Sequence, residues 1–313
     1  MNHTFRTYEE IKRVSTLIKI IDDMNPPKFA YDKRYLFVGC GSSYNAGLIF
    51  SEILKQQDIN AQALSAGEIM INDKKEQISK NYDTVVFLSR TGTTTETIMA
   101  AETLKGKVKS VAITCEKDTP LSALCDMSYE LDFAHEESVV MTASFSAILR
   151  LFLNGIKKFQ LNAEDYLEKY ESLIQDELVN VKSHFVFLGY GERYYVSKES
   201  ALKVEELSLD HAEFYETLEY RHGPIALLSE KTHVVIFSQH QVANPFEVEL
   251  QKDIESRGGS VHILTSLSDK PKFEVQFLPL YSQLLGYKRA VIKGLNPDKP
   301  NGLSKSVILK TEQ

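Results

Sequence analysis

The sequence has 313 residues, of which 43% are apolar and 25% charged, and its formal net charge is −7. This composition predicts a globular protein of one large or two ordinary domains, and the acidic balance, with no basic cluster beyond pairs such as Lys74-Lys75, disfavours nucleic-acid binding. No apolar run approaches the ~18–20 residues that span a bilayer, and the stretch from Met1 to Arg6 lacks the apolar core of a signal peptide, so we expect a cytoplasmic protein that does not engage membranes.

Apolar runs and helical patterns predict alternating strands and helices in the first half of the chain. Residues 7–24 carry apolar side chains at helical spacing, and Pro26-Pro27 end that helix. The further elements predicted here are a strand at 35–38, a helix at about 45–57, a strand at 85–88 followed by a helix to Gly106, a strand at 108–114, a short helix from about 118–120, a strand at 127–133 and an apolar helix at 142–159.

The residues after the strand at 85–88 form a turn rich in hydroxyl groups. Ser89, Thr91 and Thr94 surround a single glycine, and Thr93 with Glu96 three residues later predicts a capping box that starts the next helix. Because free amide groups and the dipole at a helix N-terminus favour an anion, this turn is a candidate phosphate site. An ordinary capped turn is the alternative, since Ser and Thr are common at such positions.

A second turn of this kind, at residues 39–44, follows the strand at 35–38. It has a Gly-x-Gly pattern but lacks the third glycine of a dinucleotide fingerprint, since Tyr44 stands at that place. Neighbouring parallel strands bring such turns to the same edge of a sheet, so the two turns together are stronger evidence for a ligand site than either alone.

The pattern of the first half then repeats. Residues 185–191 resemble 35–41 and residues 261–264 resemble 111–114, both 150 positions further on, and 233–238 resemble 84–89 at an offset of 149. These echoes predict two copies of one βα domain. The second copy has no hydroxyl group at 239–245, which predicts one phosphate site per chain, in the first half.

The second half and the tail contain polar residues that allow two interpretations. Lys203 and Glu206 share a helix face and are either catalytic or a surface ion pair. His222, beside Gly223-Pro224, is either structural or catalytic, and Lys305, in a tail rich in Pro, Gly and Asn, is either solvated or part of an ordered arm or lid. Cys40, Cys115 and Cys125 have no CxxC spacing, which predicts reduced, buried thiols and no metal site.

Taken jointly, five blocks resemble the sugar isomerase (SIS) domain family, in particular the isomerase half of glucosamine-6-phosphate synthase and its stand-alone phosphosugar isomerase, deaminase and deglycase relatives. The blocks are residues 39–45, 88–97, 201–208, 221–224 and 303–307. The resemblance covers the chain from about residue 30 to its end. It implies an α/β fold of two tandem doubly wound, flavodoxin-like parallel-sheet domains with three-layer αβα architecture. The expected ranges are 1–160 for the first domain with the N-terminal helix, 161–182 for a polar helical connector, 183–295 for the second domain and 296–313 for a tail over the active site.

The resemblance also implies roles for individual residues. Glu206 matches the base that moves a proton between C1 and C2, and Lys203 a helper near that base. His222 matches the residue that assists ring opening in a neighbouring subunit's site. Lys305 matches the tail lysine that forms an imine with an open-chain ketose. The residues that match the substrate and phosphate pocket are Gly41, Ser42, Ser43, Ser89, Arg90, Thr91, Thr94 and Val139.

These residue types suit the implied chemistry. A carboxylate in a closed pocket shuttles a proton in both directions, a histidine titrates near neutrality, and a lysine amine condenses with a carbonyl.

Two departures from the family pattern narrow the expected function. No glutamine-hydrolysing domain precedes the fold, and Asn2 stands where that domain offers an N-terminal cysteine, so we expect no glutamine-driven amide transfer. Arg90 and Ala143 replace a Gln and a Lys of the synthase, which leaves the substrate open.

We therefore expect a cofactor-free enzyme that isomerises or deaminates an amino-sugar 6-phosphate or deglycates a fructosamine 6-phosphate, as a homodimer or tetramer with a shared active site. A non-catalytic sugar-phosphate sensor is the alternative, because this fold also serves regulators.

Overall fold

The computed structural model describes residues 5–309, which fold into two compact units. Residues 16–158 with 304–309 form the first-half unit, and residues 5–15 with 159–303 form the second-half unit. Each unit is described by itself. Residues 1–4 of the predicted first domain and 310–313 of the predicted tail lie outside the described residues.

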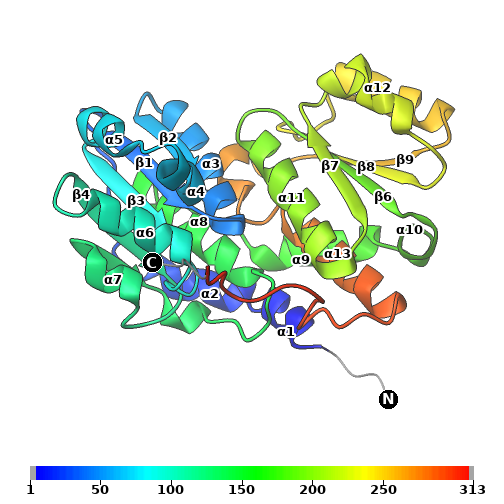
Figure 1. The fold of residues 1–313 in the computed structure, drawn as a ribbon. Helices are drawn as coiled ribbons and strands as arrows, with labels where there is room; N and C mark the ends of the chain where they lie inside the picture. Colours follow the sequence, from blue (N-terminus) through cyan, green and yellow to red (C-terminus); the bar gives the residue numbers. More distant parts are fainter. Residues whose placement is uncertain (1–4, 310–313) are drawn as a thin grey trace. The chain divides into compact units, whose positions relative to one another are not determined.

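The first-half unit contains a five-stranded parallel sheet in the order β2-β1-β3-β4-β5, the flavodoxin-like order (Figure 1). The parallel register pairs Tyr35 with Thr84, and Thr84 with Lys109. The strands are β1 (Arg34–Gly39), β2 (Asn60–Ser65), β3 (Thr84–Leu88), β4 (Lys109–Thr114) and β5 (Met127–Glu130).

Helices cover both faces of this sheet because alternate strand residues bury apolar side chains on each side. On one face, Leu36 and Val85 belong to a core with side chains of α4, α5, α6 and α7. On the other, Phe37 meets Phe50 of α3 and Phe152 of α8 at ring-centroid distances of 5.6 and 5.5 Å. The helices are α2 (Val14–Asp22), α3 (Ser42–Lys55), α4 (Ala66–Ile71), α5 (Lys75–Asn81), α6 (Thr95–Leu104), α7 (Pro120–Leu124) and α8 (Ala143–Ile156), with a 3-10 turn η1 (Asp132–Ala134).

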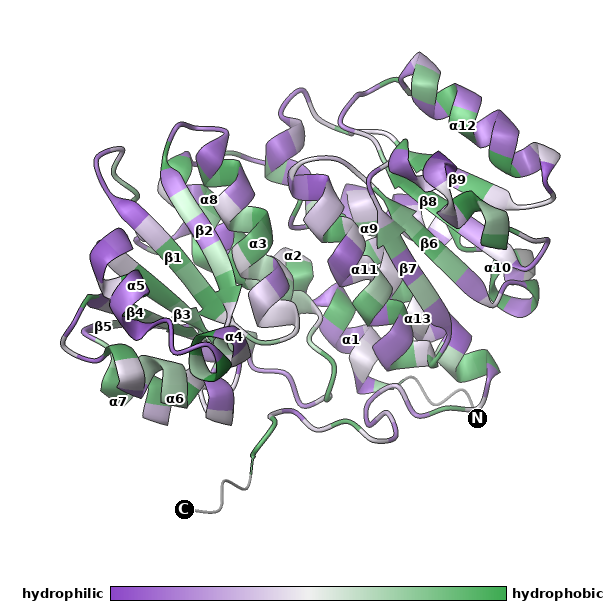
Figure 2. Ribbon diagram, turned by 45° about the horizontal axis from the view of Figure 1, so that its top comes forward, coloured by the Kyte–Doolittle hydropathy of each residue, from purple (hydrophilic) through white to green (hydrophobic). Residues whose placement is uncertain are grey.

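The second-half unit repeats this plan with four strands in the order β7-β6-β8-β9, all parallel. Figure 2 shows the central strands of both sheets as largely hydrophobic, whereas α12 mixes polar and apolar positions. The elements are α1 (Arg6–Lys12), α9 (Ala163–Leu173), α10 (Asp176–Val181), β6 (His184–Leu188), α11 (Glu192–Ser208), β7 (His211–Tyr215), η2 (Glu219–His222), η3 (Pro224–Leu227), β8 (Thr232–Phe237), α12 (Pro245–Ser256), β9 (Ser260–Leu264), η4 (Pro271–Glu274) and α13 (Leu280–Ile292).

The predicted fold class and internal repeat are confirmed. The order β2-β1-β3-β4 corresponds strand for strand to β7-β6-β8-β9. The turn glycines that open α3 and α11 share one backbone conformation, with φ and ψ of 54° and −129° at Gly41 and 57° and −130° at Gly191. Two tandem doubly wound α/β domains with three-layer αβα architecture are therefore present.

Several predicted boundaries were wrong. The single helix expected at 7–24 is two helices, α1 and α2, with a turn at Arg13 between them. The helix expected from 45 begins at Ser42, and the strand expected at 127–133 ends at Glu130, where a 3-10 turn follows. Residues 161–182, expected as a polar helical connector, contain the helices α9 and α10, and Tyr166 and Tyr170 of α9 are buried. Their role as a connector stays a prediction.

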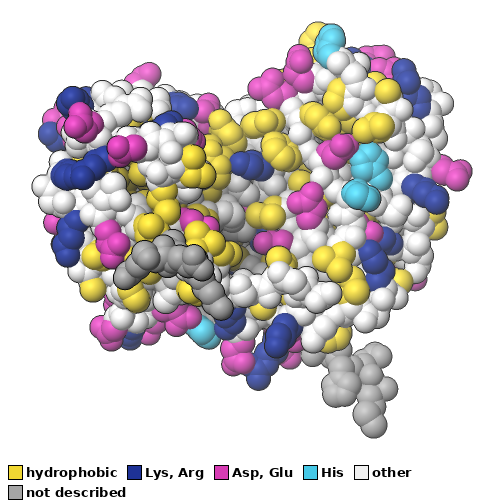
Figure 3. All heavy atoms as spheres, in the orientation of Figure 1, with side chains coloured by type: hydrophobic (Ala, Val, Ile, Leu, Met, Phe, Trp, Pro, Cys, Tyr) yellow, Lys and Arg dark blue, Asp and Glu magenta, His cyan; other side chains and the backbone are white. Residues whose placement is uncertain are grey.

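In the space-filling view of Figure 3, basic and acidic side chains are interspersed, without a broad area of one sign on the face it displays. Among the described residues, no helix combines the length and the apolar character that crossing a membrane requires.

Candidate active site

The hydroxyl turn, residues 89–94, joins β3 to α6 at the carboxyl edge of the first-half sheet. Gly92 has a φ of +64°, and a Cβ atom there would lie 2.3 Å from Thr119 Oγ1, so only glycine fits this position. Thr119 is itself the N-cap of α7, where its side chain accepts a hydrogen bond from Ser122 N. The turn is therefore fixed by its packing against α7.

The hydroxyl groups of this turn form hydrogen bonds with one another, and none of these bonds caps the following helix α6. Thr91 Oγ1 accepts hydrogen bonds from Thr93 Oγ1 at 2.8 Å and Thr93 N at 3.3 Å, and Ser89 Oγ donates to Thr94 Oγ1 at 3.4 Å. α6 begins at Thr95 and its N-cap, Thr94, makes no side-chain capping bond. The predicted capping box of Thr93 and Glu96 was therefore wrong, because Thr93 precedes the cap.

The glycine turn of residues 39–44 lies beside the hydroxyl turn, as the sequence predicted. β1 pairs with β3, and Cys40 Sγ lies 3.7 Å from Thr97 Oγ1 in the first turn of α6. Ser42 and Ser43 open α3 immediately after Gly41, and both side chains are buried. The structure thus brings both predicted turns to one edge of the sheet.

The thiols near this edge add no negative charge at neutral pH. Burial raises the pKa of Cys40 above its usual value, although a hydrogen bond from Thr97 acts against this shift. Burial also raises the pKa of Cys115 far above its usual range, with Glu136 adding to the effect. Cys115 is buried, as predicted, whereas Cys40 and Cys125 are half-buried. Uncharged thiols do not repel an incoming phosphate.

The equivalent turn of the second-half unit already holds a carboxylate. Glu247 Oε2 accepts hydrogen bonds from Ser238 Oγ at 2.7 Å and from Asn244 N at 2.9 Å, and Glu247 forms a complete capping box with Asn244. α11 also carries the acidic Glu192 in its first turn, where α3 has no acidic residue. An external anion is disfavoured there, which supports the prediction of a single phosphate site in the first half.

Arg90, within the hydroxyl turn, is buried and engaged by a neighbouring loop. Its guanidinium donates to Val139 O at 2.6 Å, Ser138 O at 3.4 Å and Glu136 Oε2 at 3.3 Å. The Glu136 carboxylate also accepts from Thr142 N and Thr142 Oγ1, at 3.0 and 2.5 Å, just before α8. Arg90 therefore holds the loop that carries Val139. A direct contact of Arg90 or Val139 with substrate stays a prediction.

The C-terminal tail docks on the hydroxyl turn within the same unit. The hydroxyl of Ser306 lies 3.1 Å from Thr93 Oγ1 and 3.3 Å from Thr94 Oγ1, and Val307 O accepts from Thr95 N at 3.1 Å. Lys305 Nζ donates to the backbone carbonyl of Glu136 at 2.8 Å. The tail segment 304–309 is thus an ordered arm that places a lysine amine beside the predicted phosphate site (Figure 1, red).

Lys203 and Glu206 form a buried charge cluster with Glu199 on α11. Lys203 Nζ lies 3.5 Å from Glu199 Oε1 and donates to Glu206 Oε2. The side chains of Lys203 and Glu199 are fully buried, whereas that of Glu206 is 23% exposed. A surface ion pair, the alternative interpretation, does not fit this burial.

A glycine of the facing helix explains how Lys203 becomes buried. A Cβ atom at Gly286 of α13 would lie 3.0 Å from Leu207 Cβ and 3.1 Å from Lys203 O, so α13 packs closely against α11 only because position 286 has no side chain. Burying a lysine is costly unless carboxylates pair with it, and Glu199 and Glu206 supply that pairing. The Glu206 carboxylate is therefore positioned by the buried Lys203 and still accessible to solvent.

His222 ends the 3-10 turn η2 on the surface of the second-half unit. The adjacent Gly223 has a φ of +141°, and Arg221 pairs with Asp253 at 2.7 Å, which anchors this turn to α12. His222 is exposed, and in the described part of the chain its side chain has no hydrogen-bond partner. The structure thus groups Ser89, Thr91, Thr94 and Lys305 in one unit, and Lys203 with Glu206 in the other.

Three residues of these clusters were missed as individual site residues. Ser306 lay inside the tail block 303–307, Glu136 just before the helix predicted at 142–159, and Glu199 four residues before Lys203. The spacing of Glu199 was a usable signal, because residues four apart share a helix face. The contacts of Ser306 and Glu136 join segments remote in sequence, which no local pattern reveals.

Comparison with known proteins identifies the family. The sequence model of the SIS domain matches residues 28–153 and 177–273, and the chain belongs to the SIS domain family. The crystal structure of glucosamine-6-phosphate deaminase from Thermotoga maritima is similar with a TM-score of 0.85 and 32% sequence identity, covering 97% of this chain and 100% of that one. The resemblance inferred from the sequence blocks is confirmed.

Two further proteins are similar to this chain, one in sequence and one in fold. The chain is 28% identical over 304 residues to glutamine–fructose-6-phosphate aminotransferase (isomerizing) of Sulfolobus acidocaldarius, covering 88% of this chain and 50% of that protein. It thus spans about half the length of the curated relatives it matches. The tagatose-6-phosphate ketose/aldose isomerase of Escherichia coli has the same fold, with a TM-score of 0.78, 20% identity and coverage of 98% and 97%.

Proposed function

We propose that the protein is a phosphosugar isomerase that deaminates an amino-sugar 6-phosphate. The observation that carries this proposal is the Glu206 carboxylate, which a fully buried lysine holds in place while its own side chain stays 23% exposed. A base that moves a proton between adjacent carbons needs this combination of fixed position and access. The similarity to a glucosamine-6-phosphate deaminase over the whole chain supports the amino-sugar substrate.

The proposed reaction uses the open-chain form of the sugar. His222 assists ring opening, which exposes the C1 aldehyde beside the carbon that bears nitrogen. Glu206 removes the proton from C2 and returns it to C1, while one proton passes from the nitrogen to O1. The resulting imine at C2 takes up one water and releases ammonia, which leaves the ketose phosphate. A fructosamine 6-phosphate would need the reverse proton transfer, from C1 to C2, while one proton passes from the nitrogen to O2. Hydrolysis of the resulting imine at C1 would release an amino acid and leave an aldose phosphate.

The hydroxyl turn would hold the 6-phosphate of this substrate. Ser89, Thr91 and Thr94 offer hydroxyl donors without adding positive charge, and α6 presents its N-terminus to the same place. The tail hydroxyl of Ser306 lies among these groups, so the phosphate would replace or join it there.

A panel of substrates tests the proposal. The full chain is incubated with glucosamine 6-phosphate, fructose 6-phosphate and a fructosamine 6-phosphate, and ammonia, free amino acid and ketose phosphate are assayed. Equal amounts of ammonia and ketose phosphate from glucosamine 6-phosphate support deamination. Release of free amino acid from the fructosamine 6-phosphate, without release of ammonia from glucosamine 6-phosphate, would contradict deamination and identify the protein as a deglycase. Tight binding of a sugar phosphate with no product at all supports the sensor alternative.

The turn makes a separate prediction about affinity. Thr91→Val keeps the shape of the side chain and removes one donor to the phosphate, so binding of fructose 6-phosphate should weaken by about 1.5–3 kcal/mol. Thr103→Val, at the other end of α6, is the matched control and should bind normally. Titration calorimetry measures the affinity of both variants. An unchanged affinity of Thr91→Val would show that the phosphate binds elsewhere.

We further propose that the protein acts as a homodimer in which His222 serves the neighbouring subunit. His222 is exposed, and its ring has no hydrogen-bond partner among residues 5–309, which is compatible with contacts outside its own chain. Glu206→Gln and His222→Ala, each inactive, should then recover part of the activity when mixed under subunit exchange, because a mixed dimer contains one intact site. Exchange demonstrated by mass spectrometry without any recovery would show that each chain builds its own site.

A further inference from the structure

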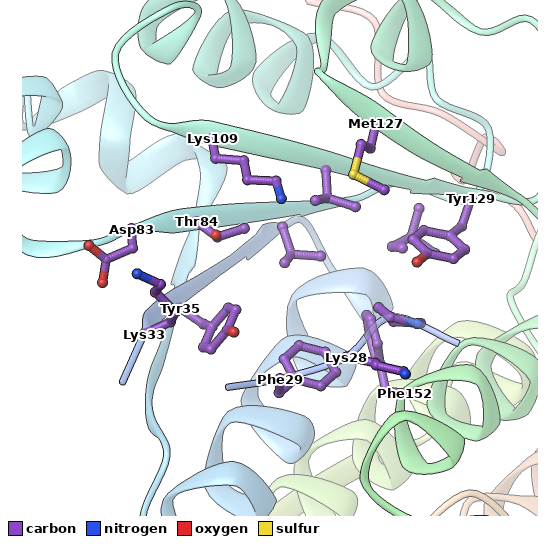
Figure 4. A pocket seen from close by; sticks show the side chains of 14 residues that line it. Lys28, Phe29, Lys33, Tyr35, Asp83, Thr84, Lys109, Met127, Tyr129 and Phe152 are labelled. Atoms are coloured by element: carbon purple, nitrogen blue, oxygen red, sulfur yellow. The ribbon is translucent and has the colours of Figure 1, made fainter. Parts of the chain in front are cut away.

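The first-half unit contains a second cavity that the proposed reaction does not use. It has a volume of about 440 Å³ and begins at the amino ends of the strands, where Thr84, Lys109 and Met127 are the first residues of β3, β4 and β5 (Figure 4). From there its lining extends along β4 to Ile113. The hydroxyl turn follows the opposite ends of the same strands. The residues that line the cavity include none of residues 89–94 of the hydroxyl turn.

The walls of this cavity are aromatic and apolar. Phe29, Tyr35, Tyr129 and Phe152 contribute rings, and Val111 with its neighbours on the sheet forms the remaining surface. A cavity of this volume and lining is typical of sites for small organic molecules. The hydroxyl groups of a sugar would find few partners against these rings, so the cavity is not a second substrate site.

The aromatic wall is preformed. The ring of Phe29 packs on Tyr35, Phe50 and Phe152, with centroid distances of 5.2, 5.0 and 6.2 Å. Tyr35 Oη also accepts a hydrogen bond from Ala30 N at 2.8 Å, which ties the loop before β1 to the sheet. A preformed wall lowers the entropic cost of binding a flat molecule.

The charged groups around the cavity are predominantly basic. Lys28, Lys33 and Lys109 line it, and Figure 4 shows the ammonium group of Lys109 directed toward the cavity. Asp83 is the one acidic residue among the lining residues, and hydrogen bonds from Arg34 hold its pKa at about 2.

The three lysines differ in how far they are engaged. Lys33 makes an exposed ion pair with Asp32 at 3.6 Å. Within the residues that the structure describes, no hydrogen bond or ion pair engages the ammonium groups of Lys28 and Lys109. Two cations are thus available to an anionic group at the cavity.

We propose that this cavity binds a small organic anion with a flat apolar body, such as an aromatic carboxylate or sulfonate, separately from the sugar-phosphate site. The apolar body would lie against Phe29, Tyr35 and Tyr129, and the anionic group would meet the ammonium group of Lys109. Burial of a flat apolar group and one charge contact on a preformed wall are sufficient for micromolar affinity.

Fluorescence titration with 8-anilinonaphthalene-1-sulfonate tests the site on the full chain. The dye should bind to the wild type with enhanced emission. Its affinity should fall about fivefold to tenfold in Lys109→Gln, because one charge contact is lost. Lys105→Gln, an exposed lysine at the end of α6 outside the cavity, is the matched control and should leave the affinity unchanged. Val111→Phe should fill the cavity and abolish binding, with circular dichroism to check its fold.

Three results would overturn the proposal. Equal dye affinity in wild type, Lys109→Gln and a folded Val111→Phe would place the dye elsewhere. Competition by fructose 6-phosphate, or loss of dye binding in Thr91→Val, would assign the dye to the hydroxyl turn. Dye binding that falls as the protein concentration rises would show that a second copy of the chain covers the cavity. None of these readouts depends on the proposed reaction, so failure of one proposal leaves the other intact.

Discussion

Replacing Glu206 by glutamine should reduce turnover of glucosamine 6-phosphate by at least about 10³-fold while substrate binding changes little. The amide keeps the size of the side chain but accepts no proton, and general base catalysis supplies about 10²–10⁴-fold of an enzymatic rate. Loss of the carboxylate also removes one of the two carboxylates that pair with the buried Lys203, the other being Glu199. Steady-state assays of ammonia release measure kcat, and calorimetry with fructose 6-phosphate measures binding.

The neighbouring Glu205 provides the matched control for this change. It lies on the same helix, directly before Glu206, and is exposed. Glu205→Gln should therefore keep nearly full activity. If Glu206→Gln turns over substrate as fast as Glu205→Gln, the Glu206 carboxylate takes no part in the mechanism.

Lys305→Ala should abolish turnover of a ketose phosphate while its binding falls much less. The phosphate donors of the hydroxyl turn stay in place, but the amine that Glu136 O now holds at 2.8 Å is lost. If this amine condenses with the open-chain carbonyl, water leaves and an imine forms. Borohydride added with fructose 6-phosphate should then trap a covalent adduct on the wild type, which mass spectrometry detects at Lys305.

Lys299→Ala is the control, because this lysine lies in the same tail and is exposed. It should form the adduct and turn over normally. An adduct on Lys305→Ala as well would place the imine on another lysine. Full turnover by Lys305→Ala would show that the reaction needs no imine with Lys305. The tail would then only close the site, and Glu206 would catalyse the proton transfer through an enediol. A sensor would form no adduct in either variant.

The strands with strong apolar runs were predictable, whereas the edge strand β2 was not. β1, β3, β4, β6 and β8 are buried along nearly their whole length, so their sequences are continuous apolar or β-branched runs. β2, in contrast, is an edge strand of mixed burial with the sequence Asn-Ala-Gln-Ala-Leu-Ser, and no periodicity marks it. Its place beside β1 follows from tertiary pairing alone.

The candidate site shows the same division between local and tertiary information. The hydroxyl turn was predictable, because strand, turn and helix are contiguous in sequence. The first residue of α6 was not predictable, because the hydroxyl of Thr93 bonds to Thr91 and to Ser306 and does not cap the helix. Ser306 lies in the tail, 213 positions further along the chain. The engagement of Arg90 by Glu136 and Val139 likewise depends on a loop 46–49 residues further along the chain.

The burial of Lys203 also could not be predicted from the sequence around it. A lysine three residues before a glutamate is usually a surface pair. Here the close approach of α13 at Gly286 buries it, and this packing depends on a helix about 80 residues away. The glycine inside the helical pattern at 280–292 was the available signal, because such a glycine often marks a close approach.

Deuterium exchange tests the central claim most directly, because it follows the proton that Glu206 is proposed to move. Fructose 6-phosphate is incubated with the protein in deuterated water, and the C1 hydrogens are followed by proton NMR. The wild type should exchange one C1 hydrogen for deuterium, with or without ammonia present, and Glu206→Gln should not. A wild-type protein that binds fructose 6-phosphate but leaves both C1 hydrogens in place would contradict the assignment of this chain as a phosphosugar isomerase.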